Sequence, residues 1–453
     1  MSRSANLPVS GGFWSGNFPA LREAGLRRYL AGQFISYAAV WAQATALNLY
    51  VYAVTGSPWH LGLLNFLLYA PTLVVSPWAG SLLSHARLKR TLKIVLAMNA
   101  SVSAALCWCV LRGTDGLALV LVLALVSGIL GAIELPARLV LVQASVRDPA
   151  LTSNAVSLNI LGANIARMVG APFGAFLYDG PGPAWAFVGC ALALLLMVAC
   201  VASMPKVHVE PATASAAGML SGLRYARSNP LTSFYLPAIG AIGLFAASYT
   251  TMVPLLADAV FGKAAAYTGL FLGFAGAGSV IAALLLSSRL GSLVATPRRI
   301  RICQWVPPLG LAAIALGAHA DFAAVVAISA AFLVLGLSIS FTNAASCAAM
   351  LQQGPAHMRG TIAGLYSMAY AGVLPFGHVL WGGLSDRFGI RVAIAAMAGG
   401  LVVILGVIHW VHARSAGMRA RPMAEAVFIE DPMGYGQYSP NGPKEAERTE
   451  ERD

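Results

Sequence analysis

Long apolar runs separated by short polar stretches occupy the chain from residue 29 to residue 412. Each run is close to the roughly 20 residues that a helix needs to cross about 30 Å of hydrocarbon. The pattern predicts an all-α membrane protein with twelve transmembrane helices, which we number as spans 1 to 12 in chain order. The predicted spans are 29–54, 59–84, 92–111, 117–137, 153–178, 183–204, 234–258, 266–288, 302–319, 322–348, 361–385 and 391–412.

The longest internal polar stretch divides these spans into six plus six. Within it, PKVHVEPATASAAG is typical of a flexible linker, and GMLSGLRYARSNP predicts a short amphipathic helix on the membrane surface. The final segment holds eight of the seventeen acidic residues among scattered glycines and prolines, which is typical of disorder. We therefore predict a cytoplasmic N-terminal segment at 1–28, a six-helix bundle at 29–204, a cytoplasmic linker at 205–233, a second six-helix bundle at 234–412, and a disordered cytoplasmic tail at 413–453.

Basic residues indicate how the helices are oriented. If the N-terminus is cytoplasmic, the loops between spans on the outer side hold only Arg112, Lys263, Arg387 and Arg391. The inner side then holds Arg22, Arg27, Arg28, Arg87, Lys89, Arg90, Arg138, Arg147, Lys206, Arg224, Arg227, Arg289, Arg298, Arg299, Arg301 and Arg359. Membrane proteins concentrate Lys and Arg on the cytoplasmic side. We therefore expect both termini in the cytoplasm and a multi-pass protein of the cell inner (plasma) membrane.

Composition supports the same class and excludes others. Of the residues, 58% are hydrophobic and 10% charged, whereas soluble domains carry about 25% charged residues. The net charge of +12 follows from the loop pattern, so we expect no nucleic-acid partner. The opening MSRSANLPVSGGFW lacks the apolar core and cleavage site of a signal peptide.

No motif for catalysis, cofactor binding or metal binding is present in the sequence. The six cysteines lie in apolar runs without metal-ligand spacing, which is typical of small core residues. A Walker phosphate loop, a nucleophile elbow and an HExxH motif are absent. We therefore expect neither an enzyme nor an ATP-driven pump, and no cofactor.

The two halves of the chain resemble each other. APFGAFLY (Ala171–Tyr178) in predicted span 5 and LPFGHVLW (Leu374–Trp381) in span 11 hold Pro-Phe-Gly triplets about 200 residues apart. LGLLNF and TGLFLGF open spans 2 and 8 at a similar offset. Parallel repeats related by an axis along the membrane normal are a common transporter architecture. This architecture predicts a substrate cavity between the halves, near the middle of the membrane.

Several stretches carry a family resemblance. They are LYVYAVTGSPWHLGLL (Leu49–Leu64), ELPARLVLVQASV (Glu134–Val146), NILGANIARMVGAPFG (Asn159–Gly174), GLRYARSNP (Gly222–Pro230) and MRGTIAGLYSMAYAGVLPFG (Met358–Gly377). Together they span about 24–412, and the chain resembles the major facilitator superfamily of transporters. Within it, the chain is similar to the branch of macrolide and siderophore (enterobactin-type) exporters. The resemblance implies two pseudo-symmetric six-helix bundles and transport by alternating access.

The chain departs from the superfamily pattern in the cytoplasmic gate loop between spans 2 and 3. The pattern there is Gly-x-Leu-x-Asp-Arg-x-x-Arg-Arg, whereas this chain reads GSLLSHARLKR from Gly80 to Arg90. Ser84 replaces the acid that normally helps to latch the two halves, while Lys89 and Arg90 are retained. Whether the latch works without this acid stays open. The branch also often carries Gly-Asp in span 1, where this chain has Ala39 and Val40.

Arg167 lies near the middle of predicted span 5, in SLNILGANIARMVGAPFGAFLY. A central arginine costs about 2.5–3.5 kcal/mol on insertion scales, so it needs a polar cavity or a partner. Asn164 lies on the same helix face. Glu134 is a candidate counter-charge, although its depth differs by about 10–15 Å from the rise per residue. Arg167 either clamps span 5 to its neighbours or meets an anionic substrate or a proton-carrying acid.

Small residues and prolines mark candidate hinges. Gly162, Gly170, Pro172 and Gly174 let span 5 pack closely and bend. Simple helix packing explains any one of these glycines, while the set fits a hinge for alternating access. Pro375 and Gly377 occupy the matching positions in span 11.

Protonatable groups within the predicted spans are few. Glu134 and His378 are the candidates for proton coupling, because a histidine titrates near pH 6.5 when unperturbed. The alternative for His378 is a structural bond to a neighbouring helix. Protons are therefore a candidate partner, and uncoupled diffusion is a further alternative.

Polar and aromatic residues in the spans are candidates for lining the cavity. Their mixture of aromatic rings and amides suits an amphiphilic molecule of moderate size, although interhelical contacts are expected to account for about half of them. The candidates are Gln33, Ser36, Tyr37, Trp41, Gln43, Asn48, Asn65, Tyr69, Tyr249, Thr250, Ser340, Thr342 and Asn343.

The sequence therefore predicts a secondary transporter that exports a small amphiphilic molecule, such as a siderophore-like metabolite or a drug. We expect it to act as a monomer within the lipid bilayer. Two alternatives remain open: an importer of a small organic solute, and a sensor or scaffold with a transporter fold but no flux. The missing acid at Ser84 and the acidic tail keep the last alternative open.

Overall fold

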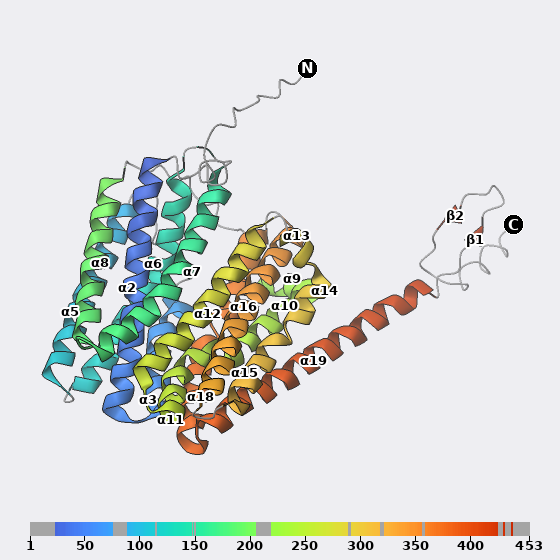
Figure 1. Ribbon diagram of the computed structural model, residues 1–453. Helices are drawn as coiled ribbons and strands as arrows, with labels where there is room; N and C mark the ends of the chain where they lie inside the picture. Colours follow the sequence, from blue (N-terminus) through green and yellow to red (C-terminus); the bar gives the residue numbers. More distant parts are fainter. Residues whose placement is uncertain are drawn as a thin grey trace.

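The computed structural model describes residues 23–75, 88–113, 116–146, 148, 151–204, 219–288, 291–317, 321–355, 358–424, 429–430 and 436–437. These residues are almost entirely helical (Figure 1). One antiparallel pair, β1 (Ile429–Glu430) and β2 (Gly436–Gln437), is an exception near the C-terminus.

The first half of the chain forms one bundle. Its helices are α2 (Ala24–Thr55), α3 (Pro58–Tyr69), α5 (Leu88–Arg112), α6 (Leu117–Ala144), α7 (Thr152–Asp179) and α8 (Ala184–Ser203). Helix α2 packs against α7 and α8, while α5 packs against α6 and α8. Buried apolar side chains such as Leu92, Leu141 and Leu194 join α5, α6 and α8 in a common core.

Helix α9 (Met219–Ser228) precedes the second bundle. That bundle consists of α10 (Pro230–Ala241), the π-helix η4 (Ile242–Ala246), the 3₁₀-helix η5 (Ala247–Thr251), α11 (Met252–Phe261), α12 (Ala264–Ser287), α13 (Gly291–Val294), α14 (Pro297–Cys303), α15 (Val306–Leu316), α16 (Phe322–Gln353), α17 (Arg359–Tyr370), α18 (Leu374–Phe388) and α19 (Ile390–Ala424). Buried side chains that include Phe271, Phe332 and Trp381 form its core.

Nine helical segments in the described part of the chain are long and apolar enough to cross a membrane. Large apolar side chains such as Leu192, Leu316 and Phe322 are exposed on the outside. Lipid contact explains this exposure, because helices satisfy their own backbone polar groups and hydrocarbon is a solvent for apolar side chains.

Three of the predicted spans are not among these nine. Helix α2 contains several polar side chains, including Gln33, Gln43 and Asn48, which lower its hydropathy. Predicted span 9 is interrupted between α14 and α15, and predicted span 11 is interrupted between α17 and α18. An apolar run predicts a segment, but it does not show whether the helix is continuous.

The ends of several helices differ from the predicted boundaries. Helix α6 continues to Ala144, beyond the predicted end at 137. Helix α19 continues to Ala424, so residues 413–424 are helical, although we expected them to belong to a disordered tail. Gly56 and Gly262 end α2 and α11 with φ of 61° and 64°. Glycine adopts this left-handed conformation without the steric penalty of a side chain.

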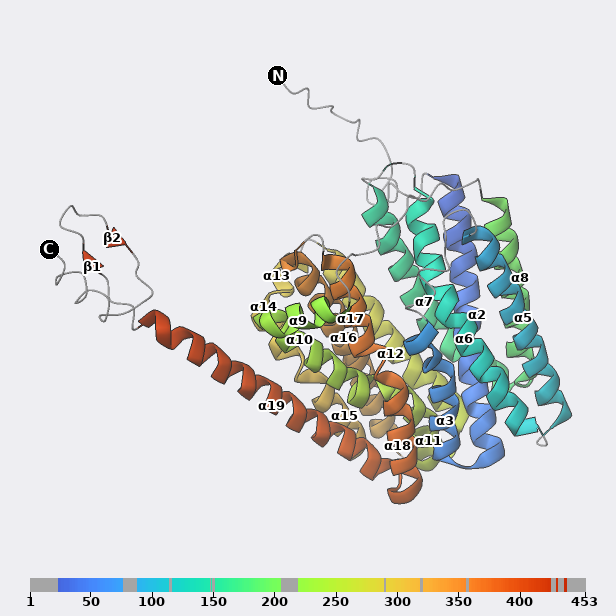
Figure 2. The same cartoon turned by 180° about the vertical axis from the view of Figure 1, so that it is seen from behind.

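The two halves lie side by side and meet along two helix pairs (Figures 1 and 2). Helix α7 packs against α12, and α3 packs against α18. Helices α3, α11 and α18 lie at the end of the molecule away from the start of α2 (Figure 2). We call this end, which carries Gly56 and Gly389, the joined end, because hydrogen bonds link the halves there.

Candidate functional site

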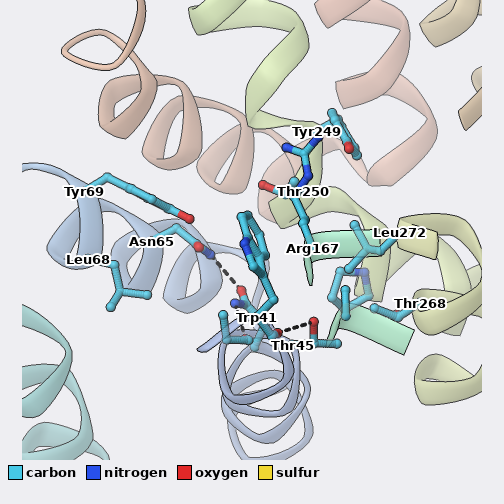
Figure 3. A pocket seen from close by; sticks show the side chains of 14 residues that line it. Trp41, Thr45, Asn65, Leu68, Tyr69, Arg167, Tyr249, Thr250, Thr268 and Leu272 are labelled. Atoms are coloured by element: carbon cyan, nitrogen blue, oxygen red, sulfur yellow. Dashed lines mark hydrogen bonds between the residues drawn. The ribbon is translucent and has the colours of Figure 1, made fainter. Parts of the chain in front are cut away.

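A cavity lies on the seam between the halves. Figure 3 shows the side chains around it, with Asn65 and Tyr69 on one side and Tyr249 and Leu272 on the other. The fourteen lining residues come from α2, α3 and α7 of the first half and η5, α11 and α12 of the second: Trp41, Ala44, Thr45, Asn48, Asn65, Leu68, Tyr69, Arg167, Ala171, Tyr249, Thr250, Pro254, Thr268 and Leu272.

The irregular stretch η4–η5 explains how the second half contributes polar groups to this cavity. A π-turn and a 3₁₀-turn interrupt the seventh segment and place Tyr249 and Thr250 on the cavity wall. Such interruptions are frequent at functional sites, and transporters use discontinuous helices to build binding sites. On the opposite wall, Asn65 Nδ2 donates to Asn48 Oδ1 at 2.7 Å, which holds the two amides in place.

Arg167 is the charged residue among the fourteen that line the cavity. Its guanidinium Cζ lies 5.6 Å from the centre of the Trp41 ring, an arrangement that stabilises a cation. Its Nη2 donates to Ser279 Oγ on α12, across the seam between the halves. No carboxylate among the described residues lies within ion-pairing distance of Arg167.

Glu134 is not the counter-charge of Arg167. It forms an ion pair with Arg138 one turn along α6, at 2.7 Å, and both side chains are buried. Arg138 also donates to Ser36 Oγ at 2.9 Å and lies over the Tyr37 ring at 4.5 Å. The prediction that placed Arg138 in an inner loop is also wrong. Helix α6 is longer than expected and keeps this arginine inside the bundle.

The network around Glu134 extends to further polar groups. Asn99 Nδ2 donates to Glu134 Oε2 at 3.2 Å, and Ser127 Oγ donates to Asn99 Oδ1 at 3.0 Å. Buried charges are stable in a low-dielectric interior when they are paired and hydrogen-bonded. All the residues of this network belong to the first half of the chain, so the network stabilises that half and does not link it to the second.

His378 lies on the seam, in the first turns of α18. Its side chain is fully buried, its Nδ1 is 2.6 Å from Thr251 Oγ1, and its ring stacks on Tyr69 of the other half at 5.5 Å. Nε2 has no hydrogen-bond partner among the described residues. Because Tyr69 also lines the cavity, a change at His378 can reach both the seam and the site.

Two hydroxyl–carboxylate bonds tie the halves together at the joined end. Tyr52 Oη donates to Asp258 Oδ2 at 3.1 Å, and Ser57 Oγ donates to Asp386 Oδ1 at 3.0 Å. Both donors belong to the first half and both carboxylates to the second. The two halves are therefore in direct contact at this end.

Close backbone packing accompanies these bonds. A side chain at Gly62 of α3 would overlap the backbone of His378, and one at Gly382 of α18 would overlap the backbone of Pro58. On the other pair, Pro172 of α7 packs against Gly269 and Gly273 of α12. Small residues at these positions allow the helices of the two halves to approach closely.

The predicted hinge residues serve different contacts. Side chains at Gly170 and Gly174 would overlap backbone oxygens of α2, whereas one at Gly162 would meet nothing within 4 Å. Pro375 and Gly377 are buried at the start of α18, where Gly377 packs against Leu244 and Ser248. All but Gly162 therefore have a packing reason for their size or shape.

The remaining predicted site residues lie outside the cavity lining. Gln33 Nε2 donates to Asn159, Asn164 donates to the Ile160 carbonyl at 3.0 Å, and Asn343 accepts from the Tyr366 hydroxyl. Gln43 is buried in α2.

The structure covers only part of the predicted gate loop. Lys89 and Arg90 lie in the first turn of α5, and Lys89 Nζ donates to the Met204 carbonyl at 2.5 Å. Gly80 and Ser84 lie outside the described residues.

Sequence reasoning missed Arg138, Ser279, Thr45 and Thr268. The i, i+4 spacing of Glu134 and Arg138 in ELPAR was a signal that the two pair within one helix. Nothing in the sequence marks Ser279 as the acceptor of Arg167, because the two residues are 112 positions apart.

Comparison with known proteins agrees with this architecture. The chain is 23% identical over 395 residues to the Staphyloferrin A transporter of Staphylococcus aureus (strain NCTC 8325 / PS 47), covering 85% of this chain and 95% of that protein. The fold resembles the crystal structure of the nucleoside transporter NupG, with a TM-score of 0.65, 12% identity and coverage of 85% of this chain and 98% of NupG.

A POT family transporter, crystallised with a thioalcohol-conjugated peptide, has a TM-score of 0.64 at 11% identity, with coverage of 86% of this chain and 96% of that one. Residues 15–432 match the family described as transmembrane secretion effector. The chain therefore belongs to this transporter family of the major facilitator superfamily.

Proposed function

We propose that this protein is a secondary transporter with twelve membrane spans that exports a small amphiphilic molecule by alternating access. The observation that carries the proposal is the cavity on the seam between the halves, lined by Arg167, aromatic rings and amides. A site between two bundles is what rocking of one bundle against the other requires. The positive-inside pattern supports cytoplasmic termini.

With the termini in the cytoplasm, the joined end faces outward. The bonds from Tyr52 to Asp258 and from Ser57 to Asp386 then close the outer side, and the structure corresponds to an inward-facing state that loads cargo from the cytoplasm. Export is supported by the secretion-effector family, and the likeness to a Staphyloferrin A transporter supports a small-molecule cargo. A siderophore-like metabolite or a drug fits this combination.

Proton coupling is part of the proposal, with His378 as the first candidate. It is buried at the seam, and its Nε2 lacks a partner among the described residues. Glu134 is engaged by Arg138 within one bundle, so a role for this carboxylate in coupling would have to act through that pair.

The test compares metabolites in cells and in medium by untargeted mass spectrometry. The cells lack the protein, or carry the wild type, Arg167→Ala, or Arg224→Ala as a control at an exposed arginine of α9, away from the cavity. An exporter predicts that one compound accumulates inside the deletion strain and the Arg167→Ala strain. Loss of uptake would favour an importer, and no change would favour a sensor or scaffold; either result contradicts the proposal.

A further inference from the structure

The cavity carries an unbalanced positive charge. Arg167 is the charged residue among its fourteen lining residues, and no described carboxylate lies within ion-pairing distance of it. The described residues do contain a buried arginine that is neutralised: Arg138 is paired with Glu134 at 2.7 Å. The chain thus pairs the arginine that lies away from the cavity and leaves the cavity arginine without an anion.

The protein contacts of Arg167 use few of its hydrogen-bonding groups. A guanidinium has five N–H donors arranged as a fork that matches a carboxylate or another oxyanion. Ser279 Oγ is its one hydrogen-bond acceptor among the described residues. The side chain itself points into the cavity beside Trp41 and toward Tyr249 and Thr250 (Figure 3).

Ser279 is a poor permanent partner for this arginine. Its hydroxyl already accepts from Ser340 Oγ at 2.8 Å and lies 3.1 Å from the Ala275 carbonyl that it donates to. A neutral hydroxyl also leaves the arginine's charge uncompensated, which is costly within a membrane. An anion in the cavity would compensate the charge of Arg167 and compete with Ser279 for its N–H donors.

The other lining residues indicate which chemical groups the cargo carries besides its negative charge. Trp41, Tyr69 and Tyr249 supply aromatic faces, while Asn65 and Thr250 supply neutral hydrogen-bonding groups. The cavity has a volume of about 50 Å³ in this state, so a flat apolar body fits only once the two halves move apart; the aromatic faces and the few polar groups would then hold and orient it.

From these observations we infer that the cargo is an anion with a flat apolar body, and that its oxyanion takes the place of Ser279 on Arg167. The inference rests on the proposed function and narrows its substrate class. Because Ser279 belongs to α12 and Arg167 to α7, loading the anion also exchanges a bond between the halves for a bond to cargo. Ser279 is thus a positioning residue that competes with the anion.

The test uses three ligands of nearly equal size and shape: 2-naphthoate, neutral 2-naphthamide and cationic 2-naphthylmethylammonium. Binding is measured by equilibrium dialysis to the full chain in nanodiscs of uncharged phosphatidylcholine, with empty nanodiscs as the blank for lipid partition. We expect naphthoate to bind at least tenfold more tightly than the amide, which corresponds to about 1.4 kcal/mol, and the ammonium to bind most weakly.

Variants assign the preference to Arg167. Arg167→Gln should weaken naphthoate binding far more than amide binding, so that the two affinities become nearly equal, and Arg167→Lys should keep the order with a smaller gap. Ser279→Ala should raise the naphthoate affinity about threefold, because it removes the competing acceptor. A purely structural clamp between α7 and α12 would not produce that increase.

Equal affinities, tightest binding of the ammonium, or no naphthoate binding below millimolar concentration would overturn the inference. Its failure is distinguishable from failure of the proposed function. If the metabolite comparison identifies an exported neutral or cationic compound, export stands and the anion preference falls. If naphthoate binds through Arg167 while no metabolite changes its distribution, the anion site stands and export falls.

Discussion

The two bundles differ in how continuous their helices are. In the first half, α2, α5 and α7 are continuous helices. In the second half, the corresponding segments are interrupted at η4–η5, between α14 and α15, and between α17 and α18. Interruptions of this kind concentrate bending at defined points. At these three positions the second half has points at which it can bend and the first half does not, although the first half has its own break at Ala70, between α3 and the helical residues 71–75.

Matching positions in the two halves also differ in charge. Tyr29 lies five residues after the start of α2 and Tyr235 five residues after the start of α10, and both are buried. Arg138 and Ser346 lie near the corresponding ends of α6 and α16. Tyr29 Oη donates to the Arg138 carbonyl at 3.3 Å, whereas the hydroxyls of Tyr235 and Ser346 lack partners among the described residues.

A buried ion pair fixes its surroundings, because moving either partner leaves an uncompensated charge. Uncharged hydroxyls impose a much smaller constraint. The first half is therefore held by electrostatics as well as packing, while the second relies on packing alone at the matching place. Under the proposed alternating-access function, this difference would let the first bundle serve as the frame against which the second moves.

We expect the largest effect from a substitution that breaks the ion pair of the first half. Arg138→Ala should lower the free energy of unfolding by about 3–5 kcal/mol, because it leaves Glu134 buried without its partner. Ser346→Ala, the matched change in the second half, should cost less than about 1 kcal/mol. The measurement is heat-induced loss of monodisperse protein by size-exclusion chromatography. Equal losses for the two variants would contradict the asymmetry.

A second measurement compares flexibility directly by hydrogen exchange. We expect amides of η4–η5 to exchange about tenfold faster than those in the middle of α2, which corresponds to an opening about 1.4 kcal/mol easier. Irregular turns have poorer hydrogen bonds than an uninterrupted helix. Slower exchange in η4–η5 than in α2 would show that the interruptions are rigid and that the second half is not the adaptable one.

The smallest expected effect concerns the bonds between the halves. Tyr52→Phe removes the hydrogen bond to Asp258, which is worth about 1 kcal/mol, so states with the joined end open should become about fivefold more populated. Spin-label distances across that end, measured by pulsed electron resonance, report the change.

Tyr50→Phe is the matched control, because the Tyr50 hydroxyl contacts Gly113 within the first half. An equal shift in this variant would show that the bond to Asp258 is not what holds the joined end closed.

Much of the architecture follows from the chain alone. The apolar runs at 92–111, 153–178 and 322–348 correspond closely to α5, α7 and α16. The repeated Pro-Phe-Gly triplets indicated two related halves, and Trp41, Tyr69 and Tyr249 were identified as candidates for the cavity wall. Helix interruptions were not predicted, because an apolar run remains apolar whether its hydrogen bonds are regular or shifted.

The partners of the buried charges show where sequence reasoning stops. Arg167 was recognised as a charge that needs an explanation, and Glu134 was named as its candidate counter-charge. The structure places Glu134 against Arg138, on the next turn of the same helix. Depth along a helix can be estimated from the rise per residue, but the direction that a side chain faces depends on how the helix is rotated in the bundle.

The sequence by itself determined that the chain is a helical membrane protein, because lipid demands long apolar segments and these are visible directly in the order of residues. Only the tertiary structure decided that Arg167 reaches Ser279 across the seam and that Glu134 neutralises Arg138. Those pairings depend on the rotation and contact of helices that are distant in the chain, and residue order encodes that information only through the packing of the whole molecule.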